Sequence, residues 1–405
     1  MKKVELISPA GDIEKAETAF IYGADGVYLG GKKFNLRKRA GNFSLKEIKK
    51  IINIAEKYKK QVYFTLNIYF RNSDFKELKN YLSRLLDIGV KNLIISDLGA
   101  IYFINKNFKP KFNLILSTQA NVTNYYSAKF FKELGIKRII LARELTLKEI
   151  KEIKTKMRDI EIETFIHGAM CVSYSGRCLL SEYFTRRSAN RGDCAQPCRW
   201  EYYLIEKKRD DIVLEIGEDK YGTYLLSSKD LCMIEHIPEL IEAGIDAFKI
   251  EGRMKSLYYV ANTTRVYRDA IESYYKKLPS KMDLWKKELD AVSHRIYFKG
   301  FYFMYNKDSI TFKKNYKRNY KFIGYIIREI KEGIYEVKFK NPMNKNDKIE
   351  IILPNMKNLT NIKFDLLDEE FKQVTQVNIH KKHYIKIPFK VERYTIIRIP
   401  KISKK

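Results

Sequence analysis

Short apolar runs alternate with longer amphipathic stretches through the first two-thirds of the chain, a pattern typical of repeated βα units. The stretch after Ser44 is a clear helix: Ser44 and Glu47 make a capping-box sequence, and apolar residues recur at helical spacing from Ile48 to Ala55. The apolar runs predict eight strands, at Val4–Ser8, Gly26–Leu29, Val62–Asn67, Asn92–Ser96, Asn113–Thr118, Arg138–Ala142, Ile160–Ile166 and Ala247–Ile250.

Eight strands separated by helices predict a TIM-like (β/α)8 barrel within residues 1–315. An excursion at 169–223, between the seventh and eighth strands, interrupts the repeat and contains a predicted hairpin of Tyr202–Ile205 with Ile212–Ile216. An open doubly wound sheet is the alternative. No G-x-G-x-x-G follows the first strand, so the sequence does not indicate a dinucleotide site.

The pattern changes after two predicted helices, Leu257–Tyr275 and Lys281–His294, and a Lys/Arg/Tyr linker at 316–320. Residues 320–405 predict a small antiparallel barrel with strands at Phe322–Ile327, Ile334–Phe339, Lys348–Leu353, Asn361–Phe364, Val374–Ile379 and Tyr384–Ile387. Small barrels of this kind often bind RNA, but a role in oligomerisation or as a lid fits the sequence equally.

Positive charge is in large excess: 78 Lys and Arg against 49 Asp and Glu give a net charge of +29. Residues 301–405 hold 24 of these cations and 11 of the acids, a net of +13. The excess favours a polyanion such as nucleic acid as partner, although a lysine-rich composition is the simpler explanation. We expect a cytoplasmic protein without a membrane span, because the chain shows neither a signal-peptide h-region nor an 18-residue apolar run.

All five cysteines fall within 62 residues, at Cys171, Cys178, Cys194, Cys198 and Cys232. Such crowding has three physical explanations: disulfides, zinc or an iron–sulfur cluster. Disulfides are the weakest, since a cytosolic chain of this size would find them reduced. No pair has the C-x2-C spacing of zinc sites, and a larger cluster tolerates dispersed thiolates better. Spacing alone therefore favours iron–sulfur over zinc but leaves both open, together with no metal.

The run E-x-F-x-x-G-A-M-C-x4-G-x-C-x-L-S from Glu163 to Ser181 resembles the signature of peptidase family U32. Four further blocks resemble that family, at 5–30, 187–200, 227–230 and 248–256, so the likeness extends over essentially the whole chain. The family carries an old collagenase-like protease label. Its better-understood members are oxygen-independent hydroxylases with a [4Fe–4S] cluster, acting on tRNA, rRNA or ubiquinone precursors.

The resemblance is strongest to the branch of prephenate-dependent tRNA uridine hydroxylases, which make 5-hydroxyuridine at the wobble position. It implies tRNA as partner, prephenate as co-substrate and a cysteine-rich metal-binding segment at 169–232. It also implies the cluster ligands Cys171, Cys178, Cys194 and Cys232. Cys198 is then the spare thiol, and the residues do not decide between it and Cys194. A peptidase remains the alternative, although the sequence contains neither H-E-x-x-H nor G-x-S-x-G.

Reacting groups in a parallel barrel lie at the C-terminal ends of the strands. Those ends carry eight candidate site residues: Gln119, Asn121, Arg143, Glu163, His167, Lys249, Glu251 and Arg253. We interpret His167, Glu163 and Lys249 as catalytic and the others as substrate-binding, with Arg143 and Arg253 as the partners of a small dicarboxylate. The alternatives are a structural role for a lone histidine and ion pairs of the cations with Glu144 and Glu251.

Overall fold

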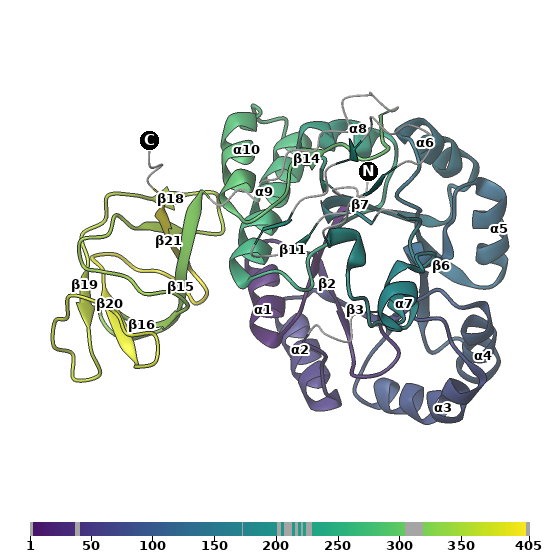
Figure 1. Cartoon of the computed structure of the whole chain (residues 1–405), viewed down its shortest axis with the longest axis horizontal. Coiled ribbons are helices and arrows are strands. Elements are labelled where there is room, and N and C mark those ends of the chain that lie inside the picture. Colours follow the sequence, from purple (N-terminus) through teal and green to yellow (C-terminus); the bar gives the residue numbers. More distant parts are fainter. Residues whose placement is uncertain are drawn as a thin grey trace.

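The computed structural model in Figure 1 describes residues 3–36, 41–171, 173–200, 229–303 and 319–401, and the backbone of four short strands between 204 and 223. Its centre is a closed barrel of eight parallel strands: β1 (Glu5–Pro9), β2 (Gly26–Gly30), β3 (Gln61–Leu66), β4 (Asn92–Ile95), β5 (Asn113–Leu116), β6 (Ile136–Ile140), β7 (Glu161–Ala169) and β13 (Ala247–Ile250). Strand β13 pairs with both β1 and β7, and this pairing closes the ring. The predicted TIM-like barrel is therefore confirmed, and the open sheet is wrong.

Helices surround the barrel: α1 (Ile13–Ile21), α2 (Leu45–Lys57), α3 (Asn72–Asp87), α4 (Leu98–Phe108), α5 (Tyr125–Glu133), α6 (Leu147–Lys156), α8 (Ile237–Glu242), α9 (Leu257–Tyr275) and α10 (Met282–Ala291). The capping box at Ser44 is present. Asp12 and Asp97 both accept a backbone hydrogen bond as N-caps, so each has a structural role at the start of its helix. None of the helices in the described ranges combines the length and the apolar character needed to span a bilayer.

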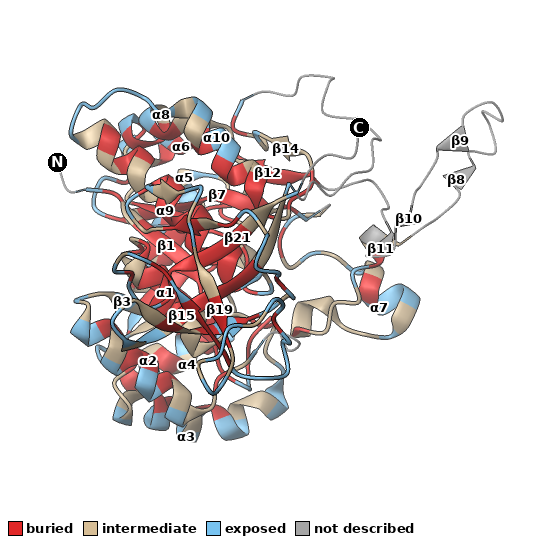
Figure 2. Cartoon of the chain, turned by 90° about the vertical axis from the view of Figure 1, so that its left-hand side faces the viewer, coloured by how far each residue is buried: buried red, intermediate tan, exposed pale blue. Residues whose placement is uncertain are grey.

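The excursion after β7 begins with the short helix α7 (Leu180–Thr185), which stands out from the barrel on the side where the strands end (Figure 2). The predicted hairpin is present as β8 (Leu204–Ile205) paired with β9 (Val213–Leu214). The excursion returns through β12 (Asp230–Cys232), which pairs antiparallel with β7 and was not predicted. Three residues are too few to produce a recognisable strand pattern.

The C-terminal residues form one antiparallel sheet, a half-barrel, in the order β18 (Asn358–Leu359), β17 (Glu350–Ile352), β21 (Ile396–Pro400), β15 (Tyr320–Lys331), β16 (Ile334–Phe339), β20 (His383–Lys386), β19 (Asp365–Leu367). The strand expected at Asn361–Phe364 is wrong, because β19 begins one residue later. Val374–Ile379 makes an isolated bridge at Gln376 rather than a ladder. The internal strand β21 was not predicted, because the buried, ion-paired Arg398 breaks its apolar run.

This sheet packs on α1, α9 and α10, and it shares a hydrophobic core with the barrel through residues such as Tyr325, Ile352 and Ile396. The Tyr22 hydroxyl of α1 donates to the carbonyls of Ile352 (3.0 Å) and Tyr394 (3.1 Å). The C-terminal domain is therefore part of one folded body rather than a tethered appendage.

Candidate active site at the barrel mouth

A cavity of about 60 Å³ lies at the C-terminal ends of the barrel strands. Parts of β2, β3, β4, β6 and β7 line it, together with four of the eight candidate site residues: Gln119, Lys249, Glu251 and Arg253. The volume holds roughly four water molecules. A dicarboxylate is larger than this, so such a ligand would extend from the cavity toward solvent.

Lys249 reaches the cavity from the middle of a buried ion-pair network. Its Nζ lies 2.7 Å from Glu163 Oε1, and Arg138 Nη1 lies 3.3 Å from Glu163 Oε2. The Lys249 ammonium also lies 4.3 Å from the centre of the Tyr28 ring. Burial lowers the pKa of Lys249, and the charge of Glu163 opposes that shift. The network thus holds a desolvated ammonium in one position at the floor of the cavity.

Arg253 lies buried on the opposite side of the same cavity, against the connection between β2 and α2. Its Nη2 donates to Asn42 Oδ1 (3.2 Å) and more weakly to Asn35 Oδ1 (3.5 Å). Gly30 permits this packing, because a Cβ at that position would lie 2.9 Å from Nη2. Arg253 therefore joins the mouth to the loop that carries Asn35 and Asn42.

Gln119 and Glu251 complete the polar lining of the cavity. The Tyr28 hydroxyl donates to Glu251 Oε2 (2.9 Å), and Asn67 Nδ2 donates to Gln119 Oε1 (3.3 Å). Gly176 of the cysteine-rich segment has a φ of +76°, and a Cβ on it would contact Gln119 at 3.3 Å. The segment thus approaches the mouth directly over Gln119.

Asn121 and Arg143 lie beside the cysteine-rich segment and are not among the described residues that line the cavity. Asn121 Nδ2 donates to the Ser175 carbonyl (3.0 Å). Arg143 Nη2 donates to Ser175 Oγ (2.7 Å), and its guanidinium lies within hydrogen-bonding reach of the Cys171 thiol. Both residues position this segment, and the structure does not place Arg143 beside Arg253 as one carboxylate clamp.

His167 points away from the mouth into the layer between β7 and α9. Its Nδ1 lies 3.2 Å from the Tyr267 hydroxyl, and burial lowers its pKa to about 3. It is the register partner of Cys232, whose Sγ lies 3.7 Å from the same hydroxyl. The pairing of β7 with β13 shifts register between Phe165 and His167, and such a bulge changes the direction of the side chains that follow it.

The described residues include all five cysteines, and none of these five is joined in a disulfide. No group of three or more His, Cys, Asp or Glu side chains within the described ranges is placed to bind a metal ion. The chemistry of the donor set, five thiols on one segment of the chain, nevertheless fits a thiolate-bound cluster. One local feature suits a cluster ligand: the Gln196 N–H donates to Cys194 Sγ (3.3 Å), as amides do to cluster sulfurs.

Four residues of the site were not identified from the sequence: Tyr28, Asn35, Asn42 and Arg138. Arg138 offered a signal, because a charged residue inside an apolar strand run requires a buried partner. In the structure its Nη2 lies 2.6 Å from both Glu5 Oε2 and Glu161 Oε2. Tyr28 and the two asparagines carried no comparable signal.

Comparison with known proteins identifies relatives over nearly the whole chain. The profile of peptidase family U32 matches residues 11–311, and that of the U32 C-terminal domain matches residues 318–398. The tRNA hydroxylation protein P1 of Bacillus subtilis is 39% identical over 378 residues, covering 91% of this chain and 88% of the relative.

Two other relatives have names that do not mention tRNA hydroxylation. An uncharacterized protease of Methanocaldococcus jannaschii is 46% identical over 312 residues, 75% of this chain and 74% of the relative. The 23S rRNA 5-hydroxycytidine C2501 synthase of Escherichia coli is 40% identical over 271 residues, 67% of this chain and 40% of the relative.

Proposed function

The chain belongs to peptidase family U32, and from that premise we propose that it is an RNA hydroxylase whose substrate is tRNA. The observation that carries the proposal is the 39% identity to a tRNA hydroxylation protein over 91% of this chain. The related rRNA hydroxycytidine synthase supports the coarser assignment of RNA hydroxylation. The finer proposal is oxygen-independent conversion of the wobble uridine to 5-hydroxyuridine, with prephenate as co-substrate.

The barrel mouth offers the chemistry that such a substrate pair needs. Lys249 and Arg253 supply two buried cations for the carboxylates of a dicarboxylate, and low local dielectric strengthens these contacts. Gln119 and Glu251 supply hydrogen-bonding groups beside them, and Glu163 holds the Lys249 ammonium in place. Loop nucleotides of RNA are already largely unstacked, so extruding one base toward the mouth costs little.

We propose further that four of the five thiols bind a [4Fe–4S] cluster, with Cys171, Cys178, Cys194 and Cys232 as ligands. Support comes from the donor set itself: five thiols within 62 residues, one accepting an amide hydrogen bond. A bound cluster would supply electron transfer or a Lewis acid for a substrate oxygen. The steps assigned to the mouth residues do not depend on it.

Anaerobically purified protein is expected to contain iron and sulfide in amounts that match one cluster. Cys171→Ser and Cys232→Ser should lose both, because each removes a ligand, whereas Cys198→Ser should retain them. The measurement is iron and sulfide analysis with absorption near roughly 400 nm, where thiolate-to-iron charge transfer absorbs. Colourless protein with stoichiometric zinc would exclude the cluster. Loss of iron in Cys198→Ser but not in Cys194→Ser would show that Cys198, rather than Cys194, is the fourth ligand.

Cells that lack this gene are expected to lose 5-hydroxyuridine and the nucleosides derived from it. Wild-type protein should restore these nucleosides to their normal level. Arg253→Ala should restore them to about one-tenth of that level or less, because one charge-assisted pair contributes roughly 1–3 kcal/mol. Mass spectrometry of tRNA nucleosides measures the result. Unchanged nucleosides in a deletion strain with no second enzyme would refute the tRNA assignment. Full complementation by Arg253→Ala would show that the cavity is not the substrate-binding site.

Two other substrates would keep the hydroxylase chemistry. If the deletion strain lacks a hydroxyl on rRNA or on a quinone precursor instead, the assigned substrate changes but the assigned reaction, hydroxylation, does not. Peptidase activity is the second candidate function, supported by the family's description and by a relative named as a protease. Collagen or casein cleavage that survives Cys→Ser replacement at all five cysteines but not Lys249→Met would favour it.

A further inference from the structure

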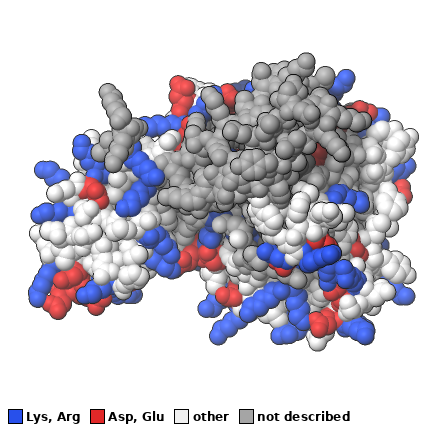
Figure 3. Space-filling view, in the orientation of Figure 1, with Lys and Arg blue, Asp and Glu red and all other residues white. Residues whose placement is uncertain are grey.

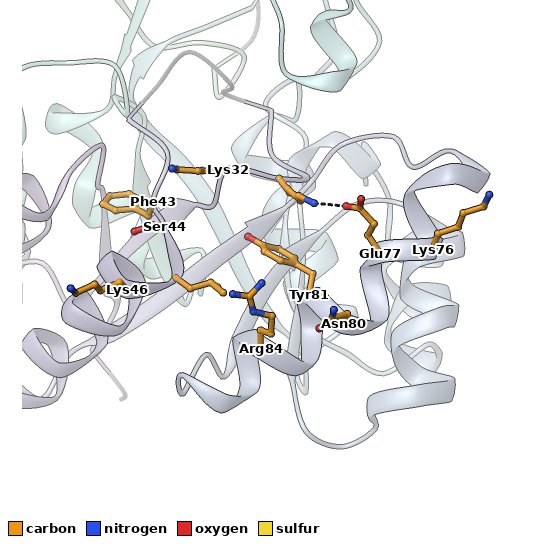
Figure 4. Close-up of a pocket in the computed structure, with 11 residues that line it drawn as sticks. Lys32, Phe43, Ser44, Lys46, Lys76, Glu77, Asn80, Tyr81 and Arg84 are labelled. Carbon is orange, nitrogen blue, oxygen red and sulfur yellow. Dashed lines mark hydrogen bonds and ion pairs between the residues drawn. The ribbon is translucent and has the colours of Figure 1, made fainter.

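A groove of about 660 Å³ lies on the flank of the barrel between α2 and α3. Figure 4 shows side chains from three segments around it: the loop after β2, the start of α2 and one face of α3. Lys32 comes from the loop, Lys46 from α2, and Tyr81 and Arg84 from α3. Tyr81 packs against Phe34 and reaches Gly31, so its ring forms a wall of the groove rather than a free stacking surface.

The charge of this groove is strongly one-sided. Five exposed cations line it, Lys32, Lys33, Lys46, Lys76 and Arg84, against one exposed carboxylate, Glu77. Glu77 pairs with Lys33, whereas the other four cations have no carboxylate partner among the described residues.

Composition alone does not explain this excess. Helix α3 carries three cations and three acids, so its own charge is balanced. Two of those acids lie outside the groove lining: Asp74 pairs with Arg191 of the cysteine-rich segment at 2.9 Å, and Asp87 is the last residue of the helix. Folding therefore brings Lys76 and Arg84 of α3 together with Lys46 of α2 in the groove, while two acids of α3 lie outside it. Figure 3 shows Lys and Arg gathered over these two helices.

The groove is connected to the barrel mouth through one loop. The segment 31–36 supplies Lys32 and Lys33 to the groove and Leu36 to the mouth cavity. Arg253 of the cavity hydrogen-bonds to Asn35 within that segment and to Asn42, which follows it before α2. A chain lying in the groove therefore runs beside the opening through which a nucleotide would enter the cavity.

We propose that this groove binds the sugar–phosphate backbone of the substrate RNA next to the nucleotide that enters the barrel mouth. The inference rests on the proposed RNA substrate and names the surface that holds it. Facing cations on two walls suit a strand that carries one negative charge per nucleotide. The groove then contributes affinity and register, while the mouth residues contribute chemistry.

The test compares two full-length variants with the same change in charge. The groove variant is Lys32→Gln, Lys46→Gln, Lys76→Gln, Arg84→Gln, and the control is Lys129→Gln, Lys137→Gln, Lys148→Gln, Lys151→Gln on the α5–α6 side of the barrel. All eight side chains are exposed, so both variants should fold. Binding of an unmodified tRNA transcript is measured at several salt concentrations, together with KM and kcat for hydroxylation.

The groove variant should bind tRNA at least roughly 30-fold more weakly than wild type. The slope of log K against log salt concentration should become shallower by about 3, because each of the four lost phosphate contacts contributes roughly 0.7–0.9. Its KM should rise while its kcat stays within about twofold, because only binding is lost. The control should stay within about threefold of wild type in affinity.

Equal losses in both variants would show that net charge alone acts, and no loss in the groove variant would show that RNA lies elsewhere. Either result overturns the groove and leaves the hydroxylase proposal intact. Competition by polyglutamate as strong as by RNA of equal charge would assign the groove to acidic peptides instead, which also overturns it. A wild-type protein that binds no tRNA would refute the proposed function, and this inference with it.

Discussion

Replacing Glu288 by glutamine is expected to lower the free energy of unfolding by about 3–5 kcal/mol, because the change leaves two buried guanidiniums without their shared carboxylate. Glu288 of α10 is fully buried, and its carboxylate lies 2.6 Å from Arg265 Nη2 and 2.7 Å from Arg398 Nη1. Arg265 belongs to α9 and Arg398 to β21, so this one carboxylate joins the barrel helices to the C-terminal sheet. Urea unfolding monitored by tryptophan fluorescence and by circular dichroism measures the loss.

Glu350→Gln is the matched control. Its carboxylate lies 2.7 Å from Arg398 Nη2 but is partly exposed, so its removal should cost about 1 kcal/mol or less. If both variants lose the same free energy of unfolding, the burial of Glu288 does not make its ion pairs more important for stability than that of Glu350. Removal of the whole C-terminal domain is a poor test of its role, since it would expose Tyr22, Arg265 and Glu288 together.

The difference between wild type and Glu288→Gln should also depend on pH. Burial alone would raise the pKa of Glu288, but the hydrogen bond and charge of Arg398 and the charge of Arg265 outweigh burial and lower it. A carboxyl with a lowered folded-state pKa stabilises the protein above its unfolded value of about 4.3, and this contribution is lost as the pH falls through the folded value. The gap between the two proteins should therefore be constant above pH ~5 and shrink below pH ~4.

Lys249→Met is expected to lower kcat/KM for RNA hydroxylation by about 100-fold or more, equivalent to about 2.7 kcal/mol at 1.36 kcal/mol per tenfold. The substitution removes the ammonium from the cavity floor but keeps the length of the side chain. Glu163 retains Arg138 as its partner, so the protein should stay folded. Single-turnover assays on an unmodified tRNA transcript, with urea unfolding of the same preparation, separate activity from stability.

Lys154→Met is the control for this variant. Lys154 Nζ pairs with Asp246 Oδ2 at 2.6 Å, but Asp246 immediately precedes β13, at the end of the barrel opposite the mouth. Because this pair is partly exposed, the variant should lose about 1 kcal/mol of stability or less and stay within about threefold of wild-type activity. A Lys249→Met protein as active as Lys154→Met would show that the mouth cavity is not where the reaction takes place.

Several features of the fold could be predicted from local sequence because short-range physics decides them. Apolar runs bounded by caps gave the strands and helices of the barrel, and Ser44 and Asp12 cap helices as their side chains predict. Gln119, Lys249, Glu251 and Arg253, which follow or end strands in the sequence, line one cavity, because parallel strands in a barrel all end at one face. Their roles stay a prediction.

Two candidates, His167 and Arg143, do not line this cavity, and the reason is also physical. Strand alternation would direct His167 to the same side as Phe165, but the register shift between them turns it toward Tyr267 and Cys232. Arg143 is also at a strand end, yet Ser175 and Cys171 of the long excursion occupy its guanidinium. Neither the bulge nor the return path of the excursion leaves a periodic signal.

The sequence by itself determined the element types, the alternation of strand and helix, and the crowding of thiols and basic residues, because these follow from neighbours a few residues apart. Only the tertiary structure decided which charges meet. Arg398 pairs with Glu288 across 110 residues, and cations from three separate segments line one groove although α3 is neutral overall. Coulombic and desolvation energies depend on distance and burial in space, and sequence separation specifies neither.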